Sequence, residues 1–179
     1  MNYSNIKFYD IANGEGIRTS LFVSGCTNHC QGCFNKETQD FNYGQLYTPE
    51  TEQTILEQVS KPYIAGLSIL GGDPLCQDID GLNNLCQLCQ EAHKLNKNIW
   101  LWTGYTWEEI MSISLTRDIR STLIERLISE CDVVVDGPFI EAQKDLTLAF
   151  RGSSNQRIID VQRTLDADKI ILYKDGAYT

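Results

Sequence analysis

The sequence predicts an α/β fold, an incomplete (βα) barrel of about five or six mostly parallel strands. Short apolar runs alternate with longer segments whose apolar residues recur every three or four positions. This alternation is typical of βαβ units around a parallel sheet. The chain of 179 residues is also shorter than the roughly 250 residues of a complete eight-stranded barrel, so it can supply only part of one.

We expect one domain over residues 1–179. This length lies within the usual range for a domain, and a hydrophobic content of 42% suffices for one packed core. No internal repeat, low-complexity segment or linker divides the chain.

The first half of the chain contains two predicted strands and a helix. Residues Thr19–Ser24 form a run with β-branched and aromatic residues that predicts a strand. Pro49–Val59 predicts a helix, because Thr48 is a suitable N-cap and proline is favoured at the first helical position. The apolar run Leu67–Leu70 predicts the next strand.

The second half contains further helical and extended segments. Apolar residues at helical spacing predict a helix over Ile79–His93 and helical structure in two pieces over Trp107–Cys131. The remaining apolar runs predict strands over Asn98–Thr103, Asp132–Asp136, Arg157–Val161 and Lys169–Tyr173.

The composition excludes several classes of function. With 24 acidic and 15 basic residues the formal net charge is −9, so we expect no nucleic-acid partner. No apolar run reaches the roughly 18 residues that cross a bilayer, and we expect no membrane association. The N-terminal segment MNYSNIKFYD lacks the basic and apolar blocks of a signal peptide, which predicts a cytoplasmic location.

The cysteines indicate ligand or redox chemistry rather than a disulfide framework, because the chain has seven and three of them fall within eight positions. Cys26, Cys30 and Cys33 follow the first predicted strand in one short loop, where their sulfurs can converge on one face of an iron–sulfur cluster. A [4Fe-4S] cluster held by three thiolates leaves one iron open to a small molecule that carries an amine and a carboxylate.

A zinc knuckle is the alternative interpretation, with His29 or a distant cysteine as the fourth ligand. Zinc sites more often pair two knuckles, and no second one lies in a predicted loop. Cys86 and Cys89 form a CxxC pair on the apolar face of a predicted helix, so we expect them in the core. Cys76 either lies near the site or is an inert small side chain.

A glycine-rich turn, Gly71-Gly72-Asp73-Pro74, follows the next predicted strand. Parallel strands present their carboxyl ends at one edge of a sheet, so this turn and the cysteine loop should be adjacent. Glycines let backbone carbonyls approach an ammonium group, and an acidic side chain adds charge-assisted attraction. The same residues also form ordinary turns, so the nearby cysteines are what favours a binding role.

The CxxxCxxC spacing, followed at once by Phe34, resembles the radical S-adenosylmethionine superfamily. Within it the chain is similar to the glycyl-radical activases of anaerobic ribonucleoside-triphosphate reductases. The similarity covers most of residues 3–157, and the tail beyond Gln156 is longer than it implies. Its specific pieces are Asn13-Gly14, Gly16, Leu21–Cys26, Gly32–Lys36, Gly71–Leu75, Trp100, Trp102–Tyr105, Val133–Gly137 and Arg151–Gln156.

The resemblance implies that Cys26, Cys30 and Cys33 hold a [4Fe-4S] cluster whose open iron chelates S-adenosyl-L-methionine. Reductive cleavage of this cofactor then gives a radical that abstracts hydrogen from a glycine of the partner, an anaerobic ribonucleotide reductase, with no catalytic residue beyond cluster and cofactor. The electron comes from flavodoxin or a similar low-potential donor. The implied cofactor contacts are Gly32, Cys33, Phe34, Gly71, Gly72, Asp73, Pro74, Thr103 and Asp136.

Some of these residues, and the function itself, also fit a second interpretation. Thr103 and Asp136 both end predicted strands on the rim of the expected site, where Asp136 equally suits a capping role. Trp100, Trp102 and Trp107 are expected to fill the core. Two alternative functions also fit the sequence: activation of another glycyl-radical enzyme of the pyruvate formate-lyase type, or a non-catalytic iron–sulfur or zinc binding module.

Overall fold

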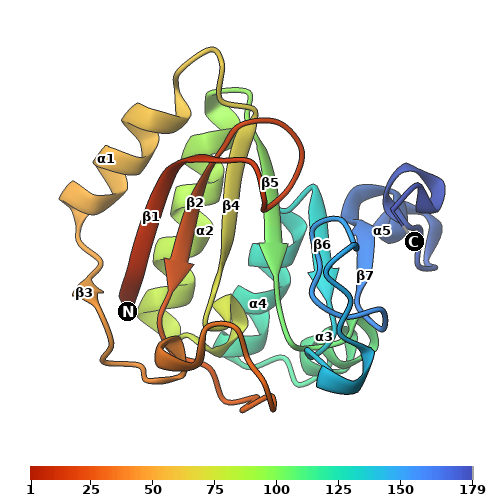
Figure 1. Cartoon of the computed structure of the whole chain (residues 1–179). Coiled ribbons are helices and arrows are strands. Elements are labelled where there is room, and N and C mark those ends of the chain that lie inside the picture. The colour runs from red at the N-terminus through yellow and green to blue at the C-terminus, as the bar shows by residue number, and fades with distance from the viewer. Residues whose placement is uncertain (179) are drawn as a thin grey trace.

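The chain folds around a seven-stranded sheet (Figure 1). The computed structural model describes residues 1–178. The strands lie in the order β3-β1-β2-β4-β5-β6-β7. Their bounds are β1 (Asn2–Asp10), β2 (Arg18–Val23), β3 (Gln45–Leu46), β4 (Gly66–Gly71), β5 (Asn98–Trp102), β6 (Val133–Asp136) and β7 (Arg157–Asp160).

Parallel strands form the centre of the sheet and antiparallel strands form its two sides. β2, β4, β5 and β6 pair in parallel, whereas β1, β3 and β7 pair antiparallel with their neighbours. The predicted α/β class is confirmed, but the sheet is mixed and has seven strands rather than five or six. The difference arises because β1 leads into β2, and β6 leads to β7, without a crossover α-helix. Both pairs can therefore be antiparallel.

The helices supply the main hydrophobic layer. α2 (Ile79–Lys94) and α4 (Ile119–Ser129) pack against each other and lie behind the sheet in Figure 1. Their inward residues Leu82, Leu85 and Leu127 are fully buried. α1 (Pro49–Val59), α3 (Trp107–Ser114) and α5 (Val161–Ala167) complete the set. None of the described helices is long and apolar enough to cross a bilayer.

Local signals set the helix boundaries. The predicted start of α1 is confirmed, because Pro49 is its first residue and the Thr48 hydroxyl accepts a hydrogen bond from the Thr51 N–H. The expected division after Trp107 is also present. Arg117 has a positive φ of 54°, and Asp118 then caps α4.

The elements at both ends of the chain differ from the expectations. β1 and β3 were not predicted, because they lie at the side of the sheet and most of their residues are exposed or half-buried, without clear apolar alternation. The strand predicted over Lys169–Tyr173 is wrong. Leu172 makes an isolated bridge with Ile159, and α5 precedes this segment, with Asp160 accepting from the Arg163 N–H as its cap.

Aromatic residues and the C-terminal segment cover the face of the sheet opposite α2 and α4. The ring of Trp100 meets those of Phe150 and Tyr173 edge-on at centroid distances of 5.3 and 5.2 Å. The Tyr173 hydroxyl donates to Glu15 Oε2 at 3.0 Å, and the Tyr178 hydroxyl also donates to Glu15. The end of the chain is therefore tied to the loop between β1 and β2.

Candidate functional site

A cavity of about 580 Å³ lies at the carboxyl ends of the parallel strands. Its walls come from the segments that follow β2, β4, β5 and β6, which are far apart in the sequence. The predicted site residues on its wall are Cys26, Cys30, Cys33, Phe34, Gly71, Gly72, Asp73 and Thr103. The glycine turn after β4 and the cysteine loop after β2 therefore meet at one edge of the sheet, as the order of the predicted strands and loops implied.

The cysteine loop is anchored through its backbone, which leaves the thiols toward the cavity. The Gly25 N–H donates to the Thr38 carbonyl at 2.7 Å, and the Cys26 N–H donates to the Gln39 carbonyl at 3.2 Å. The Cys33 N–H closes a turn onto the Cys30 carbonyl at 3.3 Å. All three cysteines are free and half-buried. Such accessible, unpaired thiols can take a metal centre without unfolding the loop.

The three cysteine sulfurs are not arranged as a preformed site for a single zinc ion. A tetrahedral zinc with Zn–S bonds of about 2.3 Å would hold its sulfurs roughly 3.8 Å apart. Among the described residues, Cys26, Cys30 and Cys33 do not form a group whose sulfurs all lie within 4.8 Å of one another. His29 is not drawn toward them either, because its Nδ1 lies 3.3 Å from Gln39 Oε1. Neither the three thiols nor His29 therefore has the arrangement of a zinc knuckle in this structure.

The glycine turn is joined directly to the cysteine loop. The Gly72 N–H donates to the Val23 carbonyl at 2.7 Å, and the Asp73 N–H donates to the Gly25 carbonyl at 2.8 Å. A Cβ on Gly72 would lie 2.5 Å from the Gly25 oxygen and 2.7 Å from the Thr38 oxygen. Position 72 therefore requires glycine because the Gly25 and Thr38 carbonyls, which lie just before and just after the cysteine loop, occupy the space of a side chain.

Asp73 organises the rim from a buried position. Its carboxylate accepts from Thr103 Oγ1 at 3.0 Å, the Gly104 N–H at 2.9 Å, Asn28 Nδ2 at 2.8 Å and the Leu75 N–H at 2.9 Å. Burial raises the pKa of Asp73 to about 7, while the Gly104 and Leu75 donors act in the opposite direction. The aspartate thus joins the loops that follow β2, β4 and β5.

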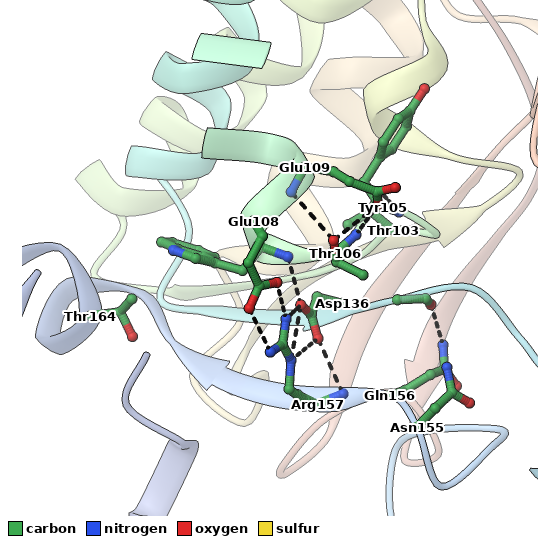
Figure 2. A network of polar contacts seen from close by, with 12 residues as sticks. Thr103, Tyr105, Thr106, Glu108, Glu109, Asp136, Asn155, Gln156, Arg157 and Thr164 are labelled. Atoms are coloured by element: carbon green, nitrogen blue, oxygen red, sulfur yellow. Dashed lines mark hydrogen bonds and ion pairs between the residues drawn. The ribbon is translucent and has the colours of Figure 1, made fainter. Parts of the chain in front are cut away.

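Asp136 is turned away from the cavity. It is 1% exposed and accepts from the Trp107 N–H at 2.7 Å, at the start of α3, and from the Arg157 guanidinium, which also pairs with Glu108 (Figure 2). Its oxygens are thus engaged in joining β6, β7 and α3. Pro74, which follows Asp73 in the sequence, is likewise buried outside the cavity wall.

Asp136→Asn is expected to destabilise the chain by about 3 kcal/mol. The amide nitrogen of asparagine cannot accept the hydrogen bonds that a carboxylate oxygen of Asp136 accepts from the Trp107 N–H and the Arg157 guanidinium. Glu108→Gln, the matched control at the other end of Arg157, should cost less than about 1 kcal/mol because the Glu108 side chain is 62% exposed. Urea unfolding of both variants measures the difference. Equal midpoints for the two variants would contradict the structural role of Asp136.

Residues 139–150, in the segment between β6 and β7, add a cavity wall that the sequence did not predict. Phe139 packs against Phe34 with ring centroids 4.9 Å apart, and Lys144 Nζ lies 4.9 Å from the Phe34 ring centroid. A Cβ on Gly32 would come within 2.8 Å of the Glu141 carboxylate, so Gly32 lies against this segment rather than on the cavity wall. The clustering of aromatic and aliphatic residues over 139–150 was the available signal.

The predicted burial of the CxxC pair and of the tryptophans is confirmed except at Trp102. Cys86 and Cys89 are buried in the helix layer, as predicted. Trp100 and Trp107 are also buried, whereas Trp102 is half-buried on the cavity wall, with its indole N–H donating to the Phe150 carbonyl at 2.7 Å. The site includes further polar residues that were not predicted: Asn28, Asn35 and Thr38. Their signal was their position inside or just after the cysteine loop.

Comparison with known proteins agrees with this geometry. A family model described as a 4Fe-4S single cluster domain matches residues 12–159. A relative from Enterobacteria phage T4 is 38% identical over 159 residues, which cover 88% of this chain and 93% of the relative. Relatives from Vibrio cholerae and Escherichia coli K12 are 40% and 38% identical, covering 88% and 87% of this chain and 97% and 96% of theirs. All three are named anaerobic ribonucleoside-triphosphate reductase-activating protein. At this identity and coverage, the chain belongs to the family of anaerobic ribonucleoside-triphosphate reductase-activating proteins.

Proposed function

We propose that this chain activates an anaerobic ribonucleotide reductase by forming a glycyl radical on it, through reductive cleavage of S-adenosyl-L-methionine at a [4Fe-4S] cluster. The observation that carries the proposal is the meeting of three free cysteines and a glycine turn in one cavity. The named relatives and the cluster-domain match support the same function. The chain would thus be an enzyme of the radical S-adenosylmethionine class.

Cys26, Cys30 and Cys33 would hold three irons and leave the fourth open on the cavity side. When bound, the reduced cluster supplies the electron that breaks a carbon–sulfur bond of the cofactor and so creates the radical that takes hydrogen from the partner's glycine. The loop holds the thiols in place through backbone bonds, as at Gly25 and Cys26, so its side chains remain free for ligation.

The glycine turn would receive the methionine part of the cofactor. Gly71, Gly72 and Asp73 line the cavity beside the cysteine loop, so their backbone can approach an ammonium group. The Asp73 carboxylate is occupied by four protein donors, which suits it to fixing the rim more than to a direct cofactor contact. The Thr103 hydroxyl is one of these donors. Thr103 also lines the cavity, where it would contact the cofactor.

The surrounding residues suit more distant roles. Phe34 faces the cavity beside the proposed ligand Cys33, and its aromatic ring can exclude water from the adenosyl part of the cofactor. Gly32 allows the segment after β6 to pack closely on the loop. Pro74 starts the short turn Pro74–Cys76, and Asp136 accepts a hydrogen bond from the N–H of Trp107, the first residue of α3, so we assign both a positioning role.

The wider arrangement fits the same proposal. We infer that residues 1–179 act as one domain and that the open mixed sheet is a partial barrel whose unclosed side admits a protein segment. A flavodoxin or another low-potential donor would supply the electron. The helices described provide no membrane span, and we propose that the reaction takes place in the cytoplasm.

The decisive experiment combines the reduced, reconstituted chain with S-adenosyl-L-methionine and an anaerobic ribonucleotide reductase without oxygen. A glycine-centred doublet in the electron paramagnetic resonance spectrum is expected, together with 5′-deoxyadenosine. The doublet should disappear when the reductase glycine is replaced by alanine. A doublet with pyruvate formate-lyase and none with the reductase would refute the partner. Cofactor cleavage that yields no doublet with either would refute a glycyl-radical target.

A further inference from the structure

A fourth cysteine lies beside the cluster loop and takes no part in the proposed chemistry. Cys76 is in the short turn Pro74–Cys76, immediately after the glycine turn, and is 9% exposed. Its sulfur, the Cys26 sulfur and a carboxylate oxygen of Asp73 all lie within 4.8 Å of one another. Two thiols from segments about fifty residues apart are therefore close enough to react after a small loop movement.

The Cys76 thiol is held in this orientation by neighbours on both sides. The Thr27 hydroxyl lies 3.2 Å from its sulfur, and the Tyr105 hydroxyl lies 3.9 Å away. Cys76 belongs to the buried turn that Asp73 caps, whereas Cys26 begins a half-buried loop. To close a disulfide, the two sulfurs, which lie within 4.8 Å of each other, would have to approach to about 2.05 Å.

The other cysteines outside the loop lack this relationship. Cys86 and Cys131 direct their thiols to the carbonyls of Leu123 and Leu127, at 3.6 and 3.2 Å. Cys89 is fully buried in the helix layer with them. Among the four cysteines outside the proposed ligand set, Cys76 is thus the one that the described residues place against a ligand thiol.

We infer that Cys76 is the resolving thiol for Cys26: when the cluster is absent and a peroxide is present, the two cysteines form a reversible disulfide. Cys26 is the more exposed and reacts first, giving a sulfenic acid and one water. The Cys76 thiol then attacks the Cys26 sulfur, the S–O bond breaks, and a second water leaves. In total two thiols and one hydrogen peroxide give one disulfide and two waters.

The identification of Cys26 as a cluster ligand rests on the proposed function, and the disulfide chemistry does not. In the loaded chain the Cys26 sulfur would be bonded to iron and unavailable, so the reaction is confined to cluster-free molecules. Without a resolving thiol a sulfenic acid proceeds to sulfinic acid, which is irreversible in most proteins. Cys76 would therefore preserve a ligand through oxidation and return it when a thiol reductant is present.

The test treats chelator-stripped full-length chain with two equivalents of hydrogen peroxide, the amount that takes one unresolved thiol to sulfinic acid. Free thiols are then blocked by alkylation, and the peptides are mapped by mass spectrometry. A peptide pair linked through Cys26 and Cys76 is expected. Dithiothreitol followed by iron and sulfide should then restore the iron content of the untreated chain. In Cys76→Ser the link should be absent, Cys26 should carry sulfinic acid, and iron uptake should remain largely lost.

Cys131→Ser is the matched control, because a hydroxyl can keep the bond to the Leu127 carbonyl, and it should behave as the wild type. Cys76→Ala, with circular dichroism on both variants, separates an altered fold from lost thiol chemistry. A link between Cys30 and Cys33 in place of the expected pair, or full iron recovery in folded Cys76→Ser, would overturn the inference. Failure of cofactor cleavage in the untreated holoenzyme would instead overturn the proposed function and leave the disulfide standing.

Discussion

Replacing any one of Cys26, Cys30 and Cys33 by alanine is expected to abolish the intact cluster and with it all cofactor cleavage. Each thiol would hold a separate iron, and the nearby Cys76 thiol lies beside the Thr27 and Tyr105 hydroxyls, outside the cavity wall. Mutations that only remove contacts behind a ligand already cost about 10–100-fold in metal affinity, so the loss of a ligand should cost more. Iron and sulfide analysis after anaerobic reconstitution, with visible absorption, measures the result.

Cys86→Ser and Cys89→Ser are the controls for these variants. Both residues lie in the buried helix layer, so the cluster and cofactor cleavage should persist. A buried hydroxyl costs roughly 1–3 kcal/mol where it lacks a partner, which would lower the unfolding midpoint without changing the iron content. A full cluster and normal cleavage in any variant of the three ligands would remove the iron–sulfur assignment.

Gly72→Val is expected to have the second largest effect, on cofactor binding and on the cysteine loop together. The added side chain would meet the backbone oxygens of Gly25 and Thr38 at distances below 3.0 Å, so the two loops must separate. Displacement of about 1 Å at a reaction centre can cost roughly 100-fold in rate. Weaker cofactor binding, measured by anaerobic titration, should therefore accompany incomplete cluster assembly.

Gly104→Ala provides the comparison for this variant. Its Cβ would meet the amide nitrogen of Asn28 at 2.1 Å, which is the end of a side chain and can move. The effect on cofactor affinity should therefore be smaller than that of Gly72→Val, with the iron content retained. If Gly72→Val binds the cofactor as tightly as the wild type, the glycine turn does not belong to the site.

Much of the fold followed from local patterns in the sequence. The central strands and α1 have strong signals, because continuous apolar runs mark buried parallel strands and a Thr-Pro pair marks a helix start. β1 lacked such a signal, since a strand at the side of a sheet does not need to be apolar. The strand expected over Lys169–Tyr173 failed for a related reason: its apolar residues cover the sheet and the aromatic layer instead of pairing along their length.

The candidate site was predictable where its residues are adjacent in the sequence. The three cysteines and the glycine turn are short motifs at strand ends, and strand order alone places them together. Tertiary contacts decided the remaining roles. Asp136 is engaged by Arg157 from the next strand, and the wall over 139–150 depends on how a long loop folds back on Phe34. No local pattern in the sequence determines such contacts.

The contacts of Glu15 with the C-terminal segment affect the order in which the molecule is completed during synthesis. Glu15 and Tyr173 are 158 residues apart, and Glu15 and Tyr178 are 163 apart. The N-terminal strands emerge from the ribosome first, whereas these hydroxyl groups appear more than 150 residues later. The nascent chain must therefore pass through a stage in which Trp100 lacks the edge-on contact with Tyr173 and the loop between β1 and β2 lacks its partners.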